Sequence, residues 1–425
     1  MSAPRGTSSA RGGRHEPTAA QAELADRLRI ARWAGAAVDA AFRAVPRHLF
    51  LPEMEPAQAY EDVAVTIQWD DDGFPVSASS QPTMMAIMLD QLGLAAGHRV
   101  LEIGTGTGYN AALIAQIVGN QRSVVTVDIV PELIGRARGN LAAAGYDEIT
   151  VICGDGAAGV PEHGPYDRVI VTAGVWDIAP QWLAQLAPGG RIVLPLSVRG
   201  IQLSIALEAA GDSDHWASRS AWRCGFIRMT GALMGPEPVV ALGPQPGLHA
   251  QAVDGLPPDA GALYEALSGP VATAPTGLRA ASIAELADLD LWLTLTEPRL
   301  TRLNMMARHE ARASRTQQRI ASLMPLGGLA EAGGSAGLGV AAVTVTAEGG
   351  LAQPGPTGIV IQGYGPGGAS LAEHLARQAV AWDEMGRPGT RHLELDVYPP
   401  GTSVIPESIV FDRPHARLAV RWLAP

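Results

Sequence analysis

Lysine is missing from this 425-residue sequence, and charged residues make up only 17% of it, with a formal net charge of −11. Proteins that follow a nucleic-acid backbone usually gather lysine and arginine on one face, so an acidic chain of this kind is not expected to bind DNA or RNA. The arginines are scattered except over Arg299–Arg319. That cluster is typical of a helix with a solvated cationic face, and a docking site for an acidic peptide is the alternative.

Cysteine is also scarce, and Cys153 and Cys224 are too few for a disulfide framework. No run of about 18 apolar residues is present, so no membrane-spanning helix is expected. The histidines do not stand at metal-ligand spacing with cysteines or acids, so no metal site is expected. Residues 1–18 are polar, lack the apolar core of a secretion signal and are expected to be a disordered leader. The cytoplasm is the expected location.

The length of the chain favours two domains, since one hydrophobic core seldom serves so many residues. From Arg99 to Pro195 strand and helix patterns alternate, which predicts a doubly wound parallel sheet with helices on both faces. An antiparallel pair, Gln202–Glu208 and Trp222–Met229, is expected to follow it. We expect residues 19–234 to form this domain, 235–276 to be a linker rich in Pro, Gly and Ala, and 277–425 to form a second, smaller α/β domain.

Two long helices are expected outside the sheet region. Gln21–Ala44 has helical periodicity, and we expect it to pack on the sheet or to cover the site. The arginine-rich segment from Arg299 to Leu323 is also expected to be helical. By contrast, the glycine-rich run from Gly363 to Gly368 is interpreted as a tight connection between a strand and a helix, because Pro366 removes a backbone donor that an anion site would use.

Residues Val100–Asn110, VLEIGTGTGYN, form the most informative motif. An apolar strand that ends in a glycine-rich turn and leads into a helix presents backbone amides to a ligand, which predicts a nucleoside pocket. Dinucleotide oxidoreductases place a third glycine five residues after the first, where this chain has Tyr109. The spacing instead matches the E-x-G-x-G-x-G pattern of class I S-adenosyl-L-methionine (AdoMet) methyltransferases, formed here by Glu102, Gly104, Thr105, Gly106 and Gly108. The alternative is a glycine-rich turn that only closes a strand.

Two further acids stand where neighbouring strands are expected to end. Asp128 ends the apolar segment SVVTVD about 20 residues after the last glycine, a position from which a carboxylate accepts hydrogen bonds from ribose hydroxyls. Asp155, with Gly156, follows the apolar segment Ile149–Cys153 and is expected near an adenine amino group. Three acidic strand ends at one sheet edge favour a nucleoside site over helix-capping roles for these acids.

Several segments, in the same order, resemble the protein-L-isoaspartate O-methyltransferase family, which methylates the α-carboxylate of isoaspartyl residues. The resemblance covers roughly residues 20–230. The matching segments are VPRHLFLPE (45–53), AYEDVAV (59–65), SSQP (79–82), VLEIGTGTGYNAALIA (100–115), GDGAAG (154–159), PYDRVIVTAG (165–174) and LAPGGRIVLPL (186–196). The resemblance implies AdoMet contacts at Glu102, the glycine loop, Asp128, Asp155 and Gly156.

The resemblance also implies a serine that holds the substrate, which falls on Ser80, with Ser79 beside it. The alternative for Ser80 is a helix N-cap ahead of Pro82. The sequence departs from the family pattern before this serine, where Trp69–Ser79 replaces a G-x-G-Q-T-I-S-type approach. It departs again after the VTA segment, where Trp176 is placed as a substrate-binding residue or, equally, as a core anchor.

The long C-terminal extension resembles a branch of these enzymes found with ribosomally made peptides of the lanthipeptide or lasso type. This resemblance implies methylation of an aspartate in a modified precursor peptide, with closure of the ester to a succinimide (aspartimide). The alternatives are repair methylation of isoaspartyl proteins and a catalytically silent AdoMet-fold protein that binds peptides. The C-terminal domain is expected to recognise the peptide, although dimer formation or cover for a sheet edge would also explain it. The oligomeric state stays open.

Overall fold

A computed structural model describes residues 18–71, 73–211, 215–236, 239–243, 248–252, 259–269, 271–297, 300–305, 328–331, 339–346 and 357–423. Apart from Thr18, the expected leader lies outside these residues. The chain divides into two compact units. Unit 1 comprises Met1–Gln68, Pro75–Ala173 and Ala179–Val193, and unit 2 comprises Trp69–Phe74, Gly174–Ile178 and Leu194–Pro425.

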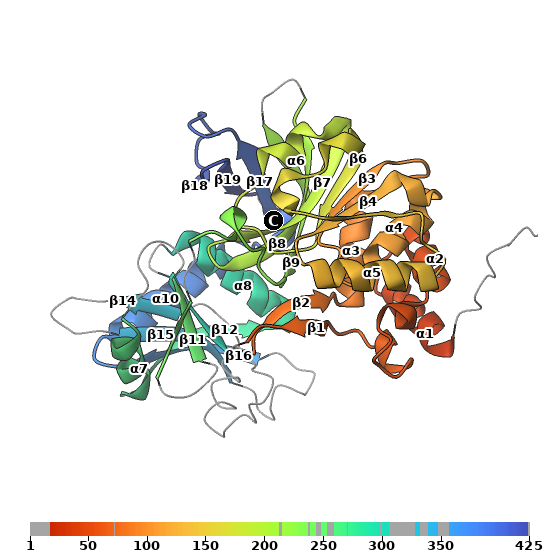
Figure 1. Ribbon diagram of the computed structural model, residues 1–425. Coiled ribbons are helices and arrows are strands. Elements are labelled where there is room, and N and C mark those ends of the chain that lie inside the picture. The colour runs from red at the N-terminus through yellow and green to blue at the C-terminus, as the bar shows by residue number, and fades with distance from the viewer. Residues whose placement is uncertain are drawn as a thin grey trace, which may run out of the picture. The chain divides into compact units, whose positions relative to one another are not determined.

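A parallel sheet forms the centre of unit 1, as predicted from the alternation of strands and helices (Figure 1). Its strands are β3 (Val100–Ile103), β4 (Val124–Asp128), β5 (Thr150–Cys153), β6 (Tyr166–Val171) and β7 (Leu186–Val198), of which residues 186–193 belong to unit 1. The order is β5-β4-β3-β6-β7, and every neighbouring pair is parallel. The strands are short and apolar because helices cover a parallel sheet on both faces.

The strand order reverses between β3 and β6. From β3 the chain moves outward to β4 and β5, and it then returns to β6 on the other side of β3. In open parallel sheets a ligand binds beyond the carboxyl ends of the strands at such a reversal, because the two connections leave in opposite directions and open a crevice. This class I methyltransferase topology puts the glycine motif, which follows β3, at that point.

Four helices connect these strands or precede them. They are α3 (Pro82–Leu92), α4 (Tyr109–Val118), α5 (Pro131–Ala143) and α6 (Pro180–Ala184). Three of them begin with proline at the first helical position, where the missing backbone amide costs no hydrogen bond. Helix α4 is apolar on nearly all sides and buried, and it packs against β4, α2 and α5.

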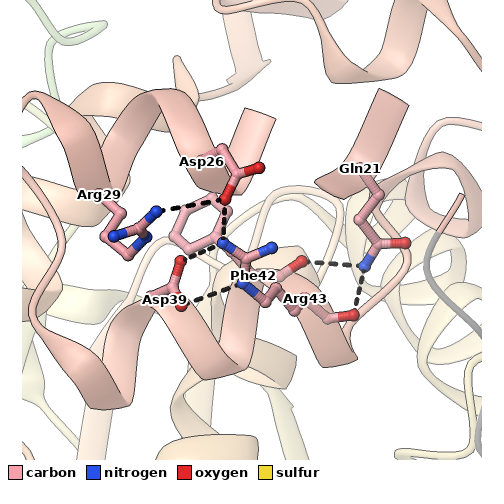
Figure 2. Close-up of polar contacts among 6 residues, drawn as sticks. All are labelled: Gln21, Asp26, Arg29, Asp39, Phe42 and Arg43. Atoms are coloured by element: carbon pink, nitrogen blue, oxygen red, sulfur yellow. Dashed lines mark hydrogen bonds and ion pairs between the residues drawn. The ribbon is translucent and has the colours of Figure 1, made fainter. Parts of the chain in front are cut away.

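The expected single helix over Gln21–Ala44 is two helices, α1 (Ala19–Ile30) and α2 (Ala36–Ala44). The break follows Arg32, whose φ is 61°, and Gly35 caps the second helix. Figure 2 shows how the helices are joined: Arg43 on α2 pairs with Asp26 on α1 at 2.7 Å, and the Gln21 amide donates to the carbonyl of Phe42 at 2.9 Å. Periodicity alone missed the break because both segments bury apolar residues on the same period.

Short elements complete unit 1. Strands β1 (Val65–Trp69) and β2 (Pro75–Ser79) form a two-stranded sheet just before α3. Short 3-10 helices occur in both units, at η1 (Arg47–Phe50), η2 (Gln58–Tyr60), η3 (Gln121–Ser123), η4 (Gly156–Ala158), η5 (Pro161–His163), η6 (Ala232–Met234) and η7 (Thr390–His392). Helix α3 begins at Pro82 and its N-cap is Gln81, so the alternative that Ser80 is the N-cap is wrong.

Unit 2 contains two groups of antiparallel strands. In the first, β8 (Ile201–Ala209) pairs with β9 (Trp216–Cys224), and β9 pairs with β17 (Leu393–Tyr398). Strand β17 pairs with β19 (Arg417–Trp422), which pairs with β18 (Ile409–Asp412). The predicted antiparallel pair is confirmed, but its second strand begins at Trp216, six residues earlier than expected.

The second group is a seven-stranded antiparallel sheet in the order β10-β11-β13-β14-β15-β16-β12. These strands are β10 (Val239–Ala241), β11 (Leu248–Ala252), β12 (Val271–Ala280), β13 (Leu300–Met305), β14 (Gly328–Glu331), β15 (Gly339–Thr346) and β16 (Thr357–Tyr364). Helices α8 (Ile283–Thr296) and α10 (Gly368–Glu384) share a buried core with it that includes Trp292 and Trp382. The connection at Gly363 is tight, as expected, since a Cβ there would meet the carbonyl oxygen of Gly368.

The structure differs from two expectations about this region. Residues 235–276, expected to be a linker, include β10, β11, α7 (Ala260–Ser268) and the start of β12, because prolines and glycines are tolerated in short and edge strands. The helix expected from Arg299 is wrong at its start, where residues 300–305 form β13, and residues 306–327 lie outside the described part. Among the described residues no helix is long and apolar enough to cross a membrane.

Candidate functional site

The glycine loop follows β3 at the strand reversal, and its first glycine is held against the end of β6. Gly104 has a φ of 100°, which disfavours any other residue, and a Cβ there would lie 2.4 Å from Oγ1 of Thr172. The Thr172 hydroxyl donates to the carbonyls of Ile103 and Gly104 at 3.0 and 2.8 Å. The sequence uses glycine here because the two strand ends approach this closely.

Asp128 at the end of β4 fixes the next part of the loop. Its carboxylate accepts hydrogen bonds from the backbone amides of Gly106 at 3.1 Å and Val130 at 3.2 Å. An ionised carboxylate has about four acceptor positions, so two backbone donors leave capacity for two hydroxyl groups. The side chain is half-buried, and Ile129 beside it is 52% exposed. A half-open carboxylate next to an exposed apolar residue suits the ribose and base of a nucleoside.

Glu102 lies inside the protein. Its side chain is fully buried, and its two oxygens accept from the Asn110 amide at 2.8 Å and the Thr126 hydroxyl at 2.7 Å. The Thr126 hydroxyl in turn lies 2.8 Å from that of Thr105. Burial raises the pKa of Glu102 to about 7, against the opposing effect of these hydrogen bonds. The contacts give Glu102 a role in holding β4 and the loop, and its predicted contact with the cofactor stays a prediction.

Gly108 and the pair Asp155 and Gly156 complete the predicted cofactor edge. Gly108 caps α4 with a φ of 85°, and a Cβ there would press on Leu141 at 3.1 Å. Asp155 is exposed just after β5, and its carboxylate accepts from the Ala157 amide at 2.9 Å. The carbonyl of Gly156 accepts from the indole of Trp182 at 2.8 Å. The acid therefore caps η4 and still presents its side chain at the sheet edge.

Ser80 lies in the turn between β2 and α3, close to the glycine loop. A Cβ on Gly106 would lie 3.8 Å from the carbonyl oxygen of Ala78, two residues before Ser80. Ser80 is half-buried, whereas Ser79 is 4% exposed. Ser79 Oγ accepts a hydrogen bond from Arg47, and the Ser80 hydroxyl has no hydrogen-bond partner among the described residues. Of the two serines, Ser80 is the more exposed, and its predicted contact with a substrate stays a prediction.

Trp176 lies in the segment Gly174–Ile178 of unit 2. The guanidinium of Arg413 stacks over its ring at 3.8 Å from the centroid, and its backbone amide donates to Leu233 at 2.8 Å. Next to it, buried Asp177 accepts from both the backbone and the ring of His415 at 2.9 Å. The segment is thus fixed to the C-terminal part of unit 2, and the half-buried indole keeps both predicted roles open.

Four residues that hold this site were not predicted from the sequence: Arg47, Asn110, Thr126 and Thr172. Each had a signal. Thr126 is a polar residue within the apolar strand SVVTVD, and Asn110 directly follows the glycine motif. Arg47 and Thr172 lie in matching segments. Within the described residues no group of three or more His, Cys, Asp or Glu side chains could hold a metal ion.

Comparison with known proteins gives a family match over the first half of the chain. The model of the protein-L-isoaspartate(D-aspartate) O-methyltransferase family (PCMT) matches residues 19–233. The protein-L-isoaspartate O-methyltransferase 2 of Archaeoglobus fulgidus is 45% identical over 173 residues, which cover 41% of this chain and 76% of that protein. The protein-L-isoaspartate O-methyltransferase of Methanopyrus kandleri is 41% identical over 188 residues, covering 44% and 80%.

Among solved structures, a protein-L-isoaspartate O-methyltransferase superposes with a TM-score of 0.47 and 22% sequence identity. The superposition covers 88% of this chain and 96% of that chain.

Proposed function

The chain belongs to the protein-L-isoaspartate(D-aspartate) O-methyltransferase family, and on that basis we propose that it methylates the α-carboxylate of isoaspartyl residues in proteins or peptides, with AdoMet as donor. The observation that carries the proposal is the position of the Ser80 turn. In this proposal the glycine loop and Asp128 form the nucleoside site at the strand reversal. The segment that leads into the Ser80 turn passes the same loop, since a Cβ on Gly106 would lie 3.8 Å from the carbonyl oxygen of Ala78. A donor and an acceptor site side by side are what group transfer requires.

The chain's own residues fit the donor. Gly104 and Gly106 leave the loop without side chains, and Asp128 retains acceptor capacity for the ribose hydroxyls. Asp155 at the neighbouring strand end is exposed, and we propose that it accepts a hydrogen bond from the amino group of the base. When bound, AdoMet supplies an electrophilic methyl group on a positively charged sulfur.

No general base is needed for the reaction. A carboxylate has an ordinary pKa of about 4 and is ionised at neutral pH. With AdoMet bound, one oxygen of the substrate carboxylate would be the nucleophile that accepts the methyl group, and S-adenosylhomocysteine would be the product that leaves. Ser80 donates a hydrogen bond to the other oxygen and so orients the attack. Alignment of this kind, with water excluded, contributes roughly 7–11 kcal/mol when the reacting atoms meet at about 3–3.5 Å.

The methyl ester then reacts further in a second step that the enzyme does not catalyse. The backbone nitrogen of the following residue attacks the ester carbonyl and loses its proton, and methanol leaves. The product is a succinimide. Hydrolysis of that ring returns aspartate in part, which is the repair outcome.

A second candidate is methylation of an ordinary aspartate in a modified, ribosomally made precursor peptide, with the succinimide as the final product. One observation favours it: residues from both segments that depart from the family pattern belong to unit 2 and contact other residues of that unit. Phe74 in the altered approach to Ser80 contacts His249 on β11, and Trp176 stacks with Arg413. We propose that unit 2 contributes to recognition of the peptide.

The experiment is mass spectrometry after incubation with AdoMet of an isoaspartyl peptide, its aspartyl counterpart of the same sequence, and a cyclised form of that counterpart. The main proposal expects one added methyl group on the isoaspartyl peptide alone. Methylation of an aspartyl peptide, followed by a product one water lighter than the starting peptide, would support the second candidate instead. If calorimetry shows that AdoMet binds and none of the three peptides is methylated, the protein is the catalytically silent binding protein.

A further inference from the structure

Arg47 is a buried cation that contacts the Ser80 turn between β2 and α3. It begins η1 and has no exposed surface. Its guanidinium donates to the carbonyls of Ala59 at 3.1 Å and Glu61 at 3.2 Å on one side. On the other side it donates to the Ser80 carbonyl at 3.0 Å and, over a longer 3.4 Å, to Ser79 Oγ. The side chain therefore ties the turn before α3 to the segment that follows η2.

The acceptors around this guanidinium are neutral carbonyl and hydroxyl oxygens. Among the described residues no carboxylate lies within ion-pair distance of Arg47. Burial lowers the pKa of Arg47, and Asp62 opposes that shift from a distance. Burying a cation without a contacting anion is expensive, so its retention here calls for a reason.

Asp62 holds the same turn from the other side. Its carboxylate accepts from the Thr83 amide at 2.9 Å, the Thr83 hydroxyl at 2.6 Å and the Gln81 amide at 3.2 Å. These bonds engage the first turn of α3. Arg47 thus holds the backbone carbonyl of Ser80, and Asp62 holds the first turn of α3 that follows. The Ser80 hydroxyl is left for a ligand.

We propose that Arg47 is a positioning residue for Ser80 and that its buried charge makes the turn selective for an ionised carboxylate. The proposal rests on the function proposed above. Arg47 orients Ser80 through the backbone carbonyl, and the substrate carboxylate, bound at the Ser80 hydroxyl, supplies negative charge close to a cation that no carboxylate contacts directly. In a partly buried site such charge attraction is weakly screened. The methyl ester is neutral, so the same attraction is lost in the product and its release is favoured.

The test compares Arg47→Gln, which removes the charge, with Arg47→Lys, which keeps the charge and loses the planar fork. Steady-state methylation of the isoaspartyl peptide is measured together with AdoMet affinity by calorimetry. We expect Arg47→Gln to raise KM for the peptide about 10-fold or more, in the range of a lost charge-assisted hydrogen bond. Arg47→Lys should recover part of that loss, and AdoMet affinity should be unchanged in both. If Arg47→Gln does not fold, Arg47→Lys alone carries the comparison.

Two further measurements separate positioning from general support of the fold. In the Ser80→Ala background, the Arg47 substitutions should have only a small further effect, about 3-fold or less, because the group they act through is gone. Arg43→Lys is the matched control, since Arg43 is a paired arginine of unit 1 that contacts Asp26 and Asp39 and not the Ser80 turn (Figure 2). It should keep the wild-type KM.

The inference is overturned if the effects of Arg47 and Ser80 substitution multiply independently, if folded Arg47 variants keep the wild-type KM, or if AdoMet affinity falls in parallel with activity. Failure of the proposed function looks different. A wild-type protein that binds AdoMet and methylates no peptide would refute that function before any variant is compared, and the inference would fall with it.

Discussion

The carboxylate of Asp128 accepts a hydrogen bond from the backbone amide of Gly106 over 3.1 Å. This contact joins two strand ends that the sequence places about 20 residues apart. It fixes the loop and at the same time leaves acceptor positions on the carboxylate for a ligand.

Asp128→Ala should weaken AdoMet binding about 10- to 100-fold, because hydrogen bonds to a charged acceptor contribute roughly 1.5–3 kcal/mol. Asp128→Asn should lose less AdoMet affinity than Asp128→Ala, since the amide oxygen of asparagine can still accept the hydrogen bond from the Gly106 amide. Calorimetric titration with AdoMet measures both. Asp147→Ala, at an exposed acid between α5 and β5, is the control. Unchanged affinity in Asp128→Ala would remove this residue from the cofactor site.

Gly104→Ala should lower the free energy of unfolding by about 2 kcal/mol or more and abolish AdoMet binding. The added methyl would lie 2.4 Å from Thr172 Oγ1, on a backbone with a φ of 100°. The matched control is Gly119→Ala at the end of α4, where φ is 73° and nothing lies within 4 Å of a Cβ. It should cost about 1 kcal/mol for the left-handed conformation alone. Denaturant unfolding gives both values, and equal losses would contradict a steric role for Gly104.

Glu102→Gln should change the pH dependence of stability. The folded pKa of Glu102, about 7, lies above its ordinary value of 4.5, so the fold favours the protonated carboxyl. The stabilisation is fully present below about pH 4.5 and is lost as the pH rises through about 7. Relative to wild type, Glu102→Gln should therefore gain stability between pH 5 and pH 8, by up to about 3 kcal/mol. Denaturant unfolding over this range is the measurement, and a difference that does not vary with pH would count against it.

Ser80→Ala should lower kcat/KM for the isoaspartyl peptide about 10-fold or more, with AdoMet affinity unchanged, because the hydroxyl orients the acceptor and does not touch the donor. Calorimetry and steady-state kinetics separate the two quantities. Equal losses in both would show that the turn supports the cofactor site instead of the substrate.

Trp176→Ala should raise KM for the peptide about 10-fold if the indole binds substrate. The control is Trp222→Ala, at an exposed tryptophan on β9 that should leave KM unchanged. A lower melting temperature with an unchanged KM would instead identify Trp176 as an anchor for Arg413 and the segment around Asp177.

The sheet edge that carries the predicted cofactor residues was the part of the fold that the sequence predicted best. An apolar strand, glycines at fixed spacing and acids at two later strand ends are local patterns, and parallel pairing brings them to one edge. The interior role of Glu102 was not evident, because its burial depends on Asn110 and Thr126, which come from different elements. Arg47 was missed for the same reason, since its acceptors lie 12 to 33 residues away.

The helix break in unit 1 and the strands of unit 2 were harder to predict. The break at Gly35 depends on a cap whose amide donates to Asp90, a contact over 55 residues. Residues 300–305 form a strand because they pair with β11 and β14, which periodicity within the segment cannot reveal. Sheets of short antiparallel strands in a region rich in glycine and proline give weak local signals, and their register depends on distant partners.

Cys153 is the last residue of β5 and is exposed, two positions before Asp155. The other cysteine, Cys224, is partly buried, and burial raises the pKa of its thiol, which slows its reaction at neutral pH. A maleimide fluorophore should therefore attach selectively at Cys153. The protein thus carries a natural labelling position beside its predicted cofactor edge, and a fluorophore there would test optically whether a nucleoside binds, without an engineered substitution.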